Sequence, residues 1–350
     1  MLRRSLLSLC IASTAMFFSV GTQASAEEFV FASWGGTYQE AIRKAWLEPF
    51  AKETGIEILE DTQPETAKVK AMVDTNTVSW DMVTGGGGTL MRGVGHGLFE
   101  EIPASVDQSG VLPGARNKYG VPSEIFSTVF AFSTKAFPDG KPQPKNWADF
   151  WDVKKFPGKR SVYNRPVTIL EAALLADGVA QADVYKELNT KAGQDRAFKK
   201  IEEIKPHVAV WWNSGAQPVQ ALGSGEVVMA TGWNGRFQAG LDNNLPIKMV
   251  WGTSIAQVGY FMIVKGAPNQ GPAVKFLNFI LQPKVQAEFS KHVAYGPVTA
   301  KAWEYITDKK RLSELPSTPE RMAEAVFMDI EFWADKQGAL TERYKSILQQ

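Results

Sequence analysis

The sequence predicts an α/β protein of two lobes joined by two strands that cross between them. Three observations indicate this class. Strands and helices alternate in residues 27–120 and again in residues 155–250, as in parallel βαβ units. A proline-rich stretch, residues 135–152, separates the two series. Two apolar runs, residues 120–134 and 257–266, read as strands that leave the first lobe and return to it. The expected architecture is therefore a hinge.

The first lobe is expected to begin with a strand at Phe29–Ser33, a glycine turn and a helix. Thr37 and Glu40 form a capping-box pattern at the start of that helix. Helical spacing predicts one buried face, made of Ile42, Trp46, Leu47 and Phe50. Gly55 is a natural end for the helix. "IEILED" then predicts a strand, "PETAKVKAMVDTN" a helix, "WDMVTG" a strand and "GTLMRGVGHG" a short helix.

The second lobe repeats the alternation with different residues. "KRSVYN" predicts a strand, followed by a helix over 166–176 and a charged helix near 195–205. "HVAVWW", a helix after Ser214 and the strand "VVMAT" complete this series. The chain beyond residue 266 is predicted to be mostly helical.

The first 26 residues predict a secretory signal peptide. Two arginines in the first four residues precede an apolar run, residues 6–20, and an A-x-A site ends at Ala26. The run is shorter than the about 20 residues of a membrane span; an uncleaved anchor is the alternative. We expect cleavage after Ala26 and export of the mature protein. The only cysteine, Cys10, leaves with this segment, so no disulfide is expected.

The composition is that of an ordinary globular protein of 350 residues, 44% of them hydrophobic. Removing the two arginines of the signal segment from the 38 basic residues leaves 36 against 37 acidic ones, a net charge of −1. This balance predicts no nucleic-acid partner.

Catalytic motifs are missing from the sequence. His96, His207 and His292 are far apart and have no partner at metal-ligand spacing. There is no H-E-x-x-H, no G-x-S-x-G and no cysteine nucleophile in the mature chain. We therefore expect no catalytic residue, no metal and no cofactor. An exported hydrolase is the alternative.

Glycine-rich turns follow three of the predicted strands, at Trp34–Gly36, Gly85–Gly88 and Gly232–Gly235. Ligands of open α/β sheets bind beyond the carboxyl ends of the strands. Glycine lets the backbone approach a ligand and frees N–H groups to point at it. Any one of these turns is also consistent with ordinary chain reversal, but three at equivalent places favour a ligand site between the lobes.

Several segments together resemble a known family. The signal peptide, "SWGGTYQEAIRKAWLEPFAKETGIEI", "WNGR" and "FMIVKGAPNQGPAVKFLNFILQPKVQAEFSKHVAYGPVTAKA" resemble the extracellular solute-binding proteins of bacterial ABC importers, in particular the spermidine/putrescine-binding group. The likeness covers nearly the whole mature chain and lies in the order and spacing of the motifs.

The resemblance implies a two-lobe type II periplasmic binding protein fold with two hinge crossings and C-terminal helices. The first lobe would comprise residues 27–134 and 260–304, and the second residues 135–259 and 305–350. The implied partners are a small-molecule ligand and an ABC importer permease in the inner membrane. We expect a monomer.

The sequence departs from the polyamine receptors at two positions. These receptors typically have Trp-Asn-Gly-Asp after the strand, and the aspartate meets an ammonium; here the fourth residue is Arg236. The acid expected before the returning hinge strand is also missing from "QVGYFM". Two like charges about 4 Å apart cost roughly 4 kcal/mol at an effective dielectric near 20, or about a thousandfold in affinity. If Arg236 faces the cleft, the ligand should carry a carboxylate or phosphonate; otherwise Arg236 caps its helix.

The predicted ligand is a small amino acid or analogue with separated charges, such as 4-aminobutyrate or an aminophosphonate. Arg236 would hold the acid, and Glu124 with aromatic residues would hold the amine. A plain organic acid is one alternative, and putrescine or spermidine another. The predicted ligand-binding residues are Ser33, Trp34, Gly86, Gly87, Glu124, Trp211, Trp233, Arg236 and Tyr260. Core packing is the alternative for each aromatic residue, and a surface position for Glu124.

Overall fold

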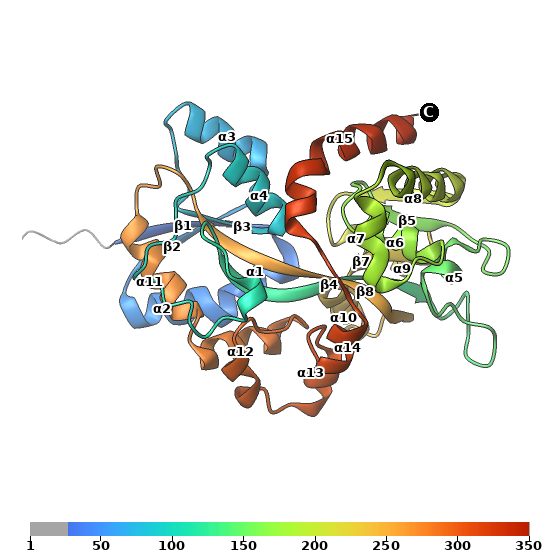
Figure 1. Cartoon of the computed structure of the whole chain (residues 1–350). Helices are drawn as coiled ribbons and strands as arrows, with labels where there is room; N and C mark the ends of the chain where they lie inside the picture. The colour runs from blue at the N-terminus through green and yellow to red at the C-terminus, as the bar shows by residue number, and fades with distance from the viewer. Residues whose placement is uncertain (1–26, 350) are drawn as a thin grey trace, which may run out of the picture.

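Two long strands run between two α/β lobes in the computed structural model, which describes residues 27–349 (Figure 1). The strands are β4 (Val121–Ser133) and β8 (Ile247–Ile263), which pair antiparallel at the centre of the molecule. The predicted signal peptide, residues 1–26, lies outside the described residues. None of the helices between residues 27 and 349 combines the length and the apolar character that a membrane span requires.

The first lobe contains the predicted strands and helices. Its strands are β1 (Glu28–Ser33), β2 (Glu57–Thr62) and β3 (Met82–Gly86). Its helices are α1 (Gly36–Ile42), α2 (Glu48–Thr54), α3 (Thr66–Asp74), α4 (Gly87–Gly95), α11 (Gln270–Ile280) and α12 (Pro283–His292). A π-helical turn, Arg43–Leu47, connects α1 to α2. The expected buried face is confirmed, because Ile42, Trp46, Leu47 and Phe50 are all buried. Gly55 ends the helix with a left-handed φ of 72°.

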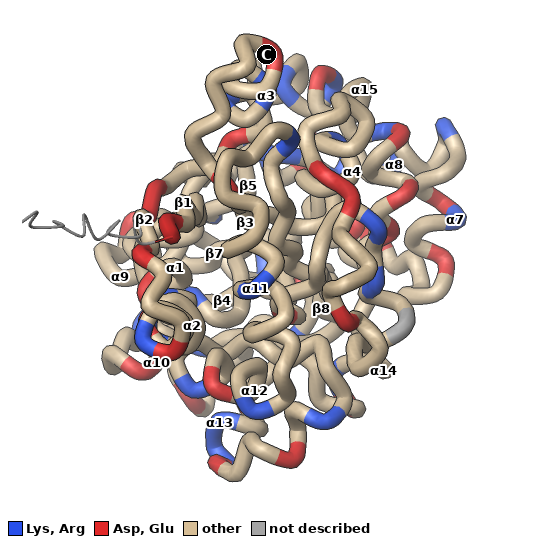
Figure 2. The backbone as a smooth tube through the Cα atoms, turned by 90° about the vertical axis from the view of Figure 1, so that its left-hand side faces the viewer, with Lys and Arg blue, Asp and Glu red and all other residues tan. Residues whose placement is uncertain are grey.

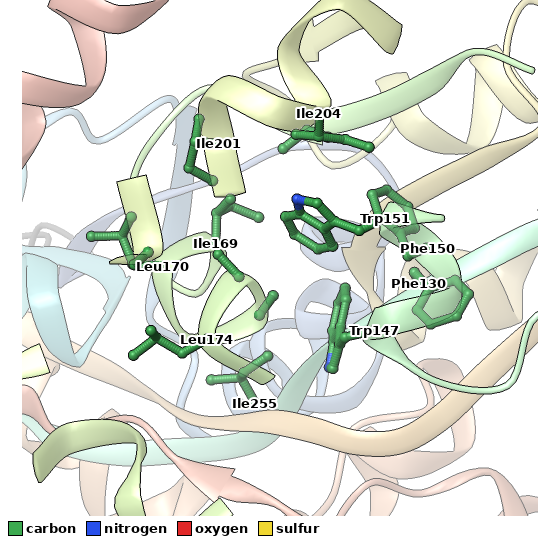
Figure 3. Packing of buried hydrophobic residues seen from close by; sticks show 14 of the residues in the cluster. Phe130, Trp147, Phe150, Trp151, Ile169, Leu170, Leu174, Ile201, Ile204 and Ile255 are labelled. Atoms are coloured by element: carbon green, nitrogen blue, oxygen red, sulfur yellow. The ribbon is translucent and has the colours of Figure 1, made fainter. Parts of the chain in front are cut away.

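The second lobe repeats the pattern on the other side of β4 and β8 (Figure 1). Its strands are β5 (Arg160–Tyr163), β6 (Val208–Trp212) and β7 (Met229–Trp233). Its helices are α5 (Trp147–Trp151), α6 (Ile169–Ala176), α7 (Val184–Leu188), α8 (Lys191–Ile204), α9 (Gln217–Ser224) and α10 (Asn234–Asp242). Aromatic and branched side chains such as Trp147, Phe150 and Ile169 form its core (Figure 3).

One continuous sheet joins the lobes in the order β2-β1-β3-β8-β4-β7-β5-β6. The predicted parallel units are confirmed, since β1 pairs parallel with β2 and β3, and β5 pairs parallel with β6 and β7. The crossing strands pair antiparallel with β3 and β7. The carboxyl ends of β1 and β3 therefore face those of β5 and β7 across β4 and β8.

The C-terminal segment also connects the two lobes. It contains α13 (Lys309–Glu314), α14 (Pro319–Glu324), β9 (Val326–Phe327) and α15 (Ile330–Gln349). Trp333 of α15 is fully buried in the second lobe and donates to Glu171 of α6 at 2.7 Å. The same helix packs against α4 of the first lobe, where Ile330 lies over the Cα of Gly87. Figure 1 shows α15 between α4 and α8.

Two local expectations differ from the structure. β8 begins at Ile247, ten residues before the predicted start. The earlier start was not predicted because residues 248–253 are partly exposed and do not form a continuous apolar run. The capping box at Thr37 does not form: α1 begins after Gly35, whose N–H donates to Gln39.

Candidate functional site

A cavity of about 140 Å³ lies between the lobes at the carboxyl ends of the strands. Trp34 follows β1 and Gly86 ends β3 on one side, while Tyr163 ends β5 and Trp233 ends β7 on the other. The crossing strands contribute Glu124 and other residues to the lining. Both lobes and the hinge therefore surround one space, as the rule for open α/β sheets requires.

Five of the nine predicted residues line this cavity: Trp34, Gly86, Glu124, Trp233 and Arg236. The two tryptophans have defined orientations. The indole N–H of Trp34 donates to the carbonyl oxygen of Thr84 at 3.2 Å. Trp233 meets Trp212 edge to face at 5.3 Å between ring centroids. Both rings are held by neighbours of their own lobes, so they offer fixed apolar walls.

The structure places Trp211 and Tyr260 away from the cavity. Successive side chains of a strand point to opposite faces, so Trp211 turns away from its neighbour Trp212 and meets Tyr344 of α15 edge to face. Tyr260 is buried within the first lobe, where its hydroxyl donates to the carbonyl oxygen of Ala115 at 3.0 Å. These two aromatic residues serve packing.

Ser33 and Gly87 also lie outside the lining. Ser33 is fully buried at the end of β1. Gly87 starts α4 under the side chain of Ile330, which leaves no room for a Cβ atom. A glycine is needed at this position because two helices from different parts of the chain approach closely here.

Arg236 faces the cavity from α10 and connects the two lobes. It is 8% exposed. Its Nη1 donates to the hydroxyl of Thr37 at 2.8 Å, and its Nη2 donates to the carbonyl oxygen of Gly35 at 3.3 Å. Its Nε has no hydrogen-bond partner within residues 27–349. Arginine has five N–H donors, so the guanidinium retains donors for a ligand while it holds the lobes together.

Glu124 lies in β4 and is 2% exposed. Its Oε1 accepts from the hydroxyl of Tyr38 at 2.7 Å, and its Oε2 has no partner in the described part of the chain. Burial raises the pKa of this carboxyl to about 7, although the nearby hydroxyls of Ser123 and Tyr38 oppose the shift. Gly259 has no side chain at the point where the carboxyl approaches it. The site therefore contains a buried carboxyl whose pKa lies near neutral pH.

Two further arginines line the cavity, Arg92 of α4 and Arg165 after β5. Arg165 forms an ion pair with Glu65 of the opposite lobe at 3.5 Å. The Nε of Arg92 has no partner among residues 27–349. Burial lowers the pKa of Arg92, and the like charge of Arg165 lowers it further. The charged residues of the described lining are thus three arginines and Glu124.

The predicted set lacks Tyr38, Arg92, Tyr163 and Arg165, which also line the cavity. Tyr163 was detectable, because it ends a predicted strand at the same edge of the sheet as Trp233. Tyr38 and Arg92 follow glycine turns by a few residues, a weaker signal. Arg165 lies in a loop, and only the tertiary structure brings it to the cavity.

Comparisons with known proteins agree with this geometry. The sequence profile of a family described as "Bacterial extracellular solute-binding protein" matches residues 45–316. The gamma-aminobutyric acid-binding protein of Pseudomonas aeruginosa is 38% identical over 94% of this chain and 93% of its own length. Spermidine/putrescine-binding periplasmic protein 1 of Haemophilus influenzae is 23% identical over 90% of this chain and 87% of its own. These relatives are binding and transport proteins rather than enzymes.

Solved structures give the same result. An ABC transporter substrate-binding protein from Bradyrhizobium japonicum has a TM-score of 0.85 and 40% identity, over 92% of this chain and 100% of that one. A structure described as the Atu4243 GABA receptor has a TM-score of 0.81 and 33% identity, over 92% and 98%. The two-lobe fold expected from the sequence is confirmed.

Proposed function

Because the chain belongs to the bacterial extracellular solute-binding protein family, we propose that it is a periplasmic receptor of an ABC importer. Its ligand is a small amino acid or amino acid analogue with separated charges, 4-aminobutyrate or an aminophosphonate. The receptor acts as a monomer and delivers this ligand to the permease. Binding needs no cofactor and no chemical step.

The position of Arg236 on the cavity wall carries the proposal. The guanidinium is nearly buried, keeps free donors and faces the space between the lobes. A carboxylate or phosphonate satisfies it with charge-assisted hydrogen bonds, whereas an ammonium about 4 Å away costs roughly 4 kcal/mol. The relative named for gamma-aminobutyric acid is also more similar to this chain than the relative named for polyamines.

The amine end of the ligand belongs at Glu124. Its free Oε2 accepts from an ammonium, and a bound cation favours the charged carboxylate that burial disfavours. Trp34 and Trp233 supply apolar and π surface for the methylene chain and the amine. An amino acid thus matches both Arg236 and Glu124, whereas a diamine matches only Glu124.

Ligand titration by calorimetry, with a thermal shift as a second readout, tests the proposal. We expect 4-aminobutyrate or its phosphonate analogue to bind and to raise the melting temperature, and putrescine to do neither. Binding of putrescine without binding of any amino acid would establish the polyamine alternative. Chemical conversion of a bound compound would establish an enzyme.

A further inference from the structure

A second cavity, of about 350 Å³, adjoins the first at the cleft surface. It lies between α3, α4 and the loop that carries Arg165. Arg92 and Arg165 line both cavities, so the two spaces meet at these side chains. The outer space is also lined by Lys70, His96 and Glu65.

Charge is unbalanced in this region. Elsewhere, acidic and basic residues are interspersed along the backbone (Figure 2), and Lys70 has its own partner in Asp74. Glu65 is the only carboxylate that lines the outer cavity in the described part of the chain, and its ion pair with Arg165 is long, at 3.5 Å. The guanidinium of Arg92 has no carboxylate partner among residues 27–349.

A ligand of the proposed kind leaves this excess in place. The acid of 4-aminobutyrate meets Arg236 and its ammonium meets Glu124, so the ligand adds no net charge. Arg92 and Arg165 then remain side by side with one shared carboxylate. An additional anionic group between them would satisfy the free donor of Arg92 and relieve the repulsion between the two guanidinium groups.

We propose that Arg92 and Arg165 form a second anion-binding station, and that the preferred ligand is an amino acid with two acidic groups and one amine. This inference rests on the proposed function and narrows its ligand class. The inner cavity holds the first acid and the amine, and the second acid extends toward the outer cavity. The ligand carries a net charge of about −1 at neutral pH.

Two matched ligand pairs test the station. L-glutamate is 4-aminobutyrate with one more carboxylate, and L-2-aminoadipate is 5-aminovalerate with one more. We expect the added carboxylate to tighten binding at least tenfold in one pair or both, measured by calorimetry in phosphate-free buffer. R92M and R165M should each remove most of this gain. R43M, which removes an exposed arginine paired with Glu60 outside the cavity, should preserve it.

The two proposals fail in different ways. If 4-aminobutyrate binds but neither added carboxylate tightens binding, the second station is refuted and the proposed function stands. The station is also refuted if the gain persists in both arginine variants. If neither these four compounds nor the phosphonate analogue of 4-aminobutyrate binds, the proposed ligand class itself is wrong, and the station falls with it. Circular dichroism of each variant identifies loss of folding; R165M then decides the outcome if R92M does not fold.

Discussion

Replacing Arg236 with methionine tests the centre of the reasoning. Methionine retains an unbranched stem as far as the position of Nε but removes the charge and all five donors. The carboxylate of the ligand loses a pair that is worth about 4 kcal/mol at a separation near 4 Å and an effective dielectric near 20, or about a thousandfold in affinity. The variant also loses the hydrogen bonds to Thr37 and Gly35 that hold the lobes together.

Companion variants separate the two roles of this side chain. Thr37→Val removes only the interlobe hydrogen bond of 2.8 Å, so we expect about a tenfold loss of affinity from a bond to a charged donor. Arg236→Lys keeps the charge without the planar fork and should fall between the wild type and methionine. Arg43→Met is the control, because Arg43 is 41% exposed and pairs with Glu60 outside the cavity. It should change affinity less than twofold.

Isothermal titration calorimetry with 4-aminobutyrate measures the series, and competition or NMR titration extends it to weak binders. An affinity of Arg236→Met within tenfold of the wild type would refute the assignment of Arg236 as the acid anchor. Equal losses in Arg236→Met and Thr37→Val would show that the guanidinium acts only through lobe closure.

Three other outcomes follow from the site and its surroundings. The pKa of Glu124 is raised from 4.5 to about 7, so the folded state loses stability relative to the unfolded state as pH rises from 4.5 to 7. The loss is about 3 kcal/mol at pH 8, from about 2.5 pKa units at 1.36 kcal/mol each. Urea unfolding should therefore show that Glu124→Gln is more stable than the wild type at pH 8 and little different from it at pH 4. The affinity of the wild type for 4-aminobutyrate should fall about tenfold per unit below pH 7 as Glu124 takes up a proton, and a flat titration profile would contradict the amine site. Asn234→Ala should cost about 3 kcal/mol in urea unfolding, because Asn234 accepts from the Ser127 N–H at 3.0 Å and donates to the Ala294 carbonyl at 2.6 Å, both buried.

Local patterns were sufficient to predict most strands and helices. The strand β1 lies where its residues predicted it, and helical spacing correctly predicted the buried face that includes Trp46. The long crossing strand β8 was predicted only in its apolar second half, since its first half lies partly exposed on the second lobe. The first half was missed because its burial depends on tertiary packing, which the local sequence pattern does not specify.

The site was predicted where it depends on strand ends and missed where it depends on lobe geometry. Trp34 and Trp233 follow strands directly, so the topology of the sheet brings them to the cavity. Arg165 reaches it from a loop whose path the sequence does not specify. The orientation of Trp211 was also undetermined. Trp211 and Trp212 have equal hydrophobicity, and only the pleat decides that Trp212 stacks on Tyr163 while Trp211 meets Tyr344.

The contact between Ile330 and Gly87 has a consequence for the transport cycle. The helix that carries Ile330 is anchored in the second lobe by Trp333, so separation of the lobes must expose this apolar contact to water. The free-energy cost of this exposure is the same with and without a bound ligand. The contact therefore favours the arrangement of the lobes seen here in the ligand-free protein as well as in the ligand-bound one. A bulkier residue in place of Gly87 would clash with Ile330 and weaken this contact, so it should make the lobes easier to separate.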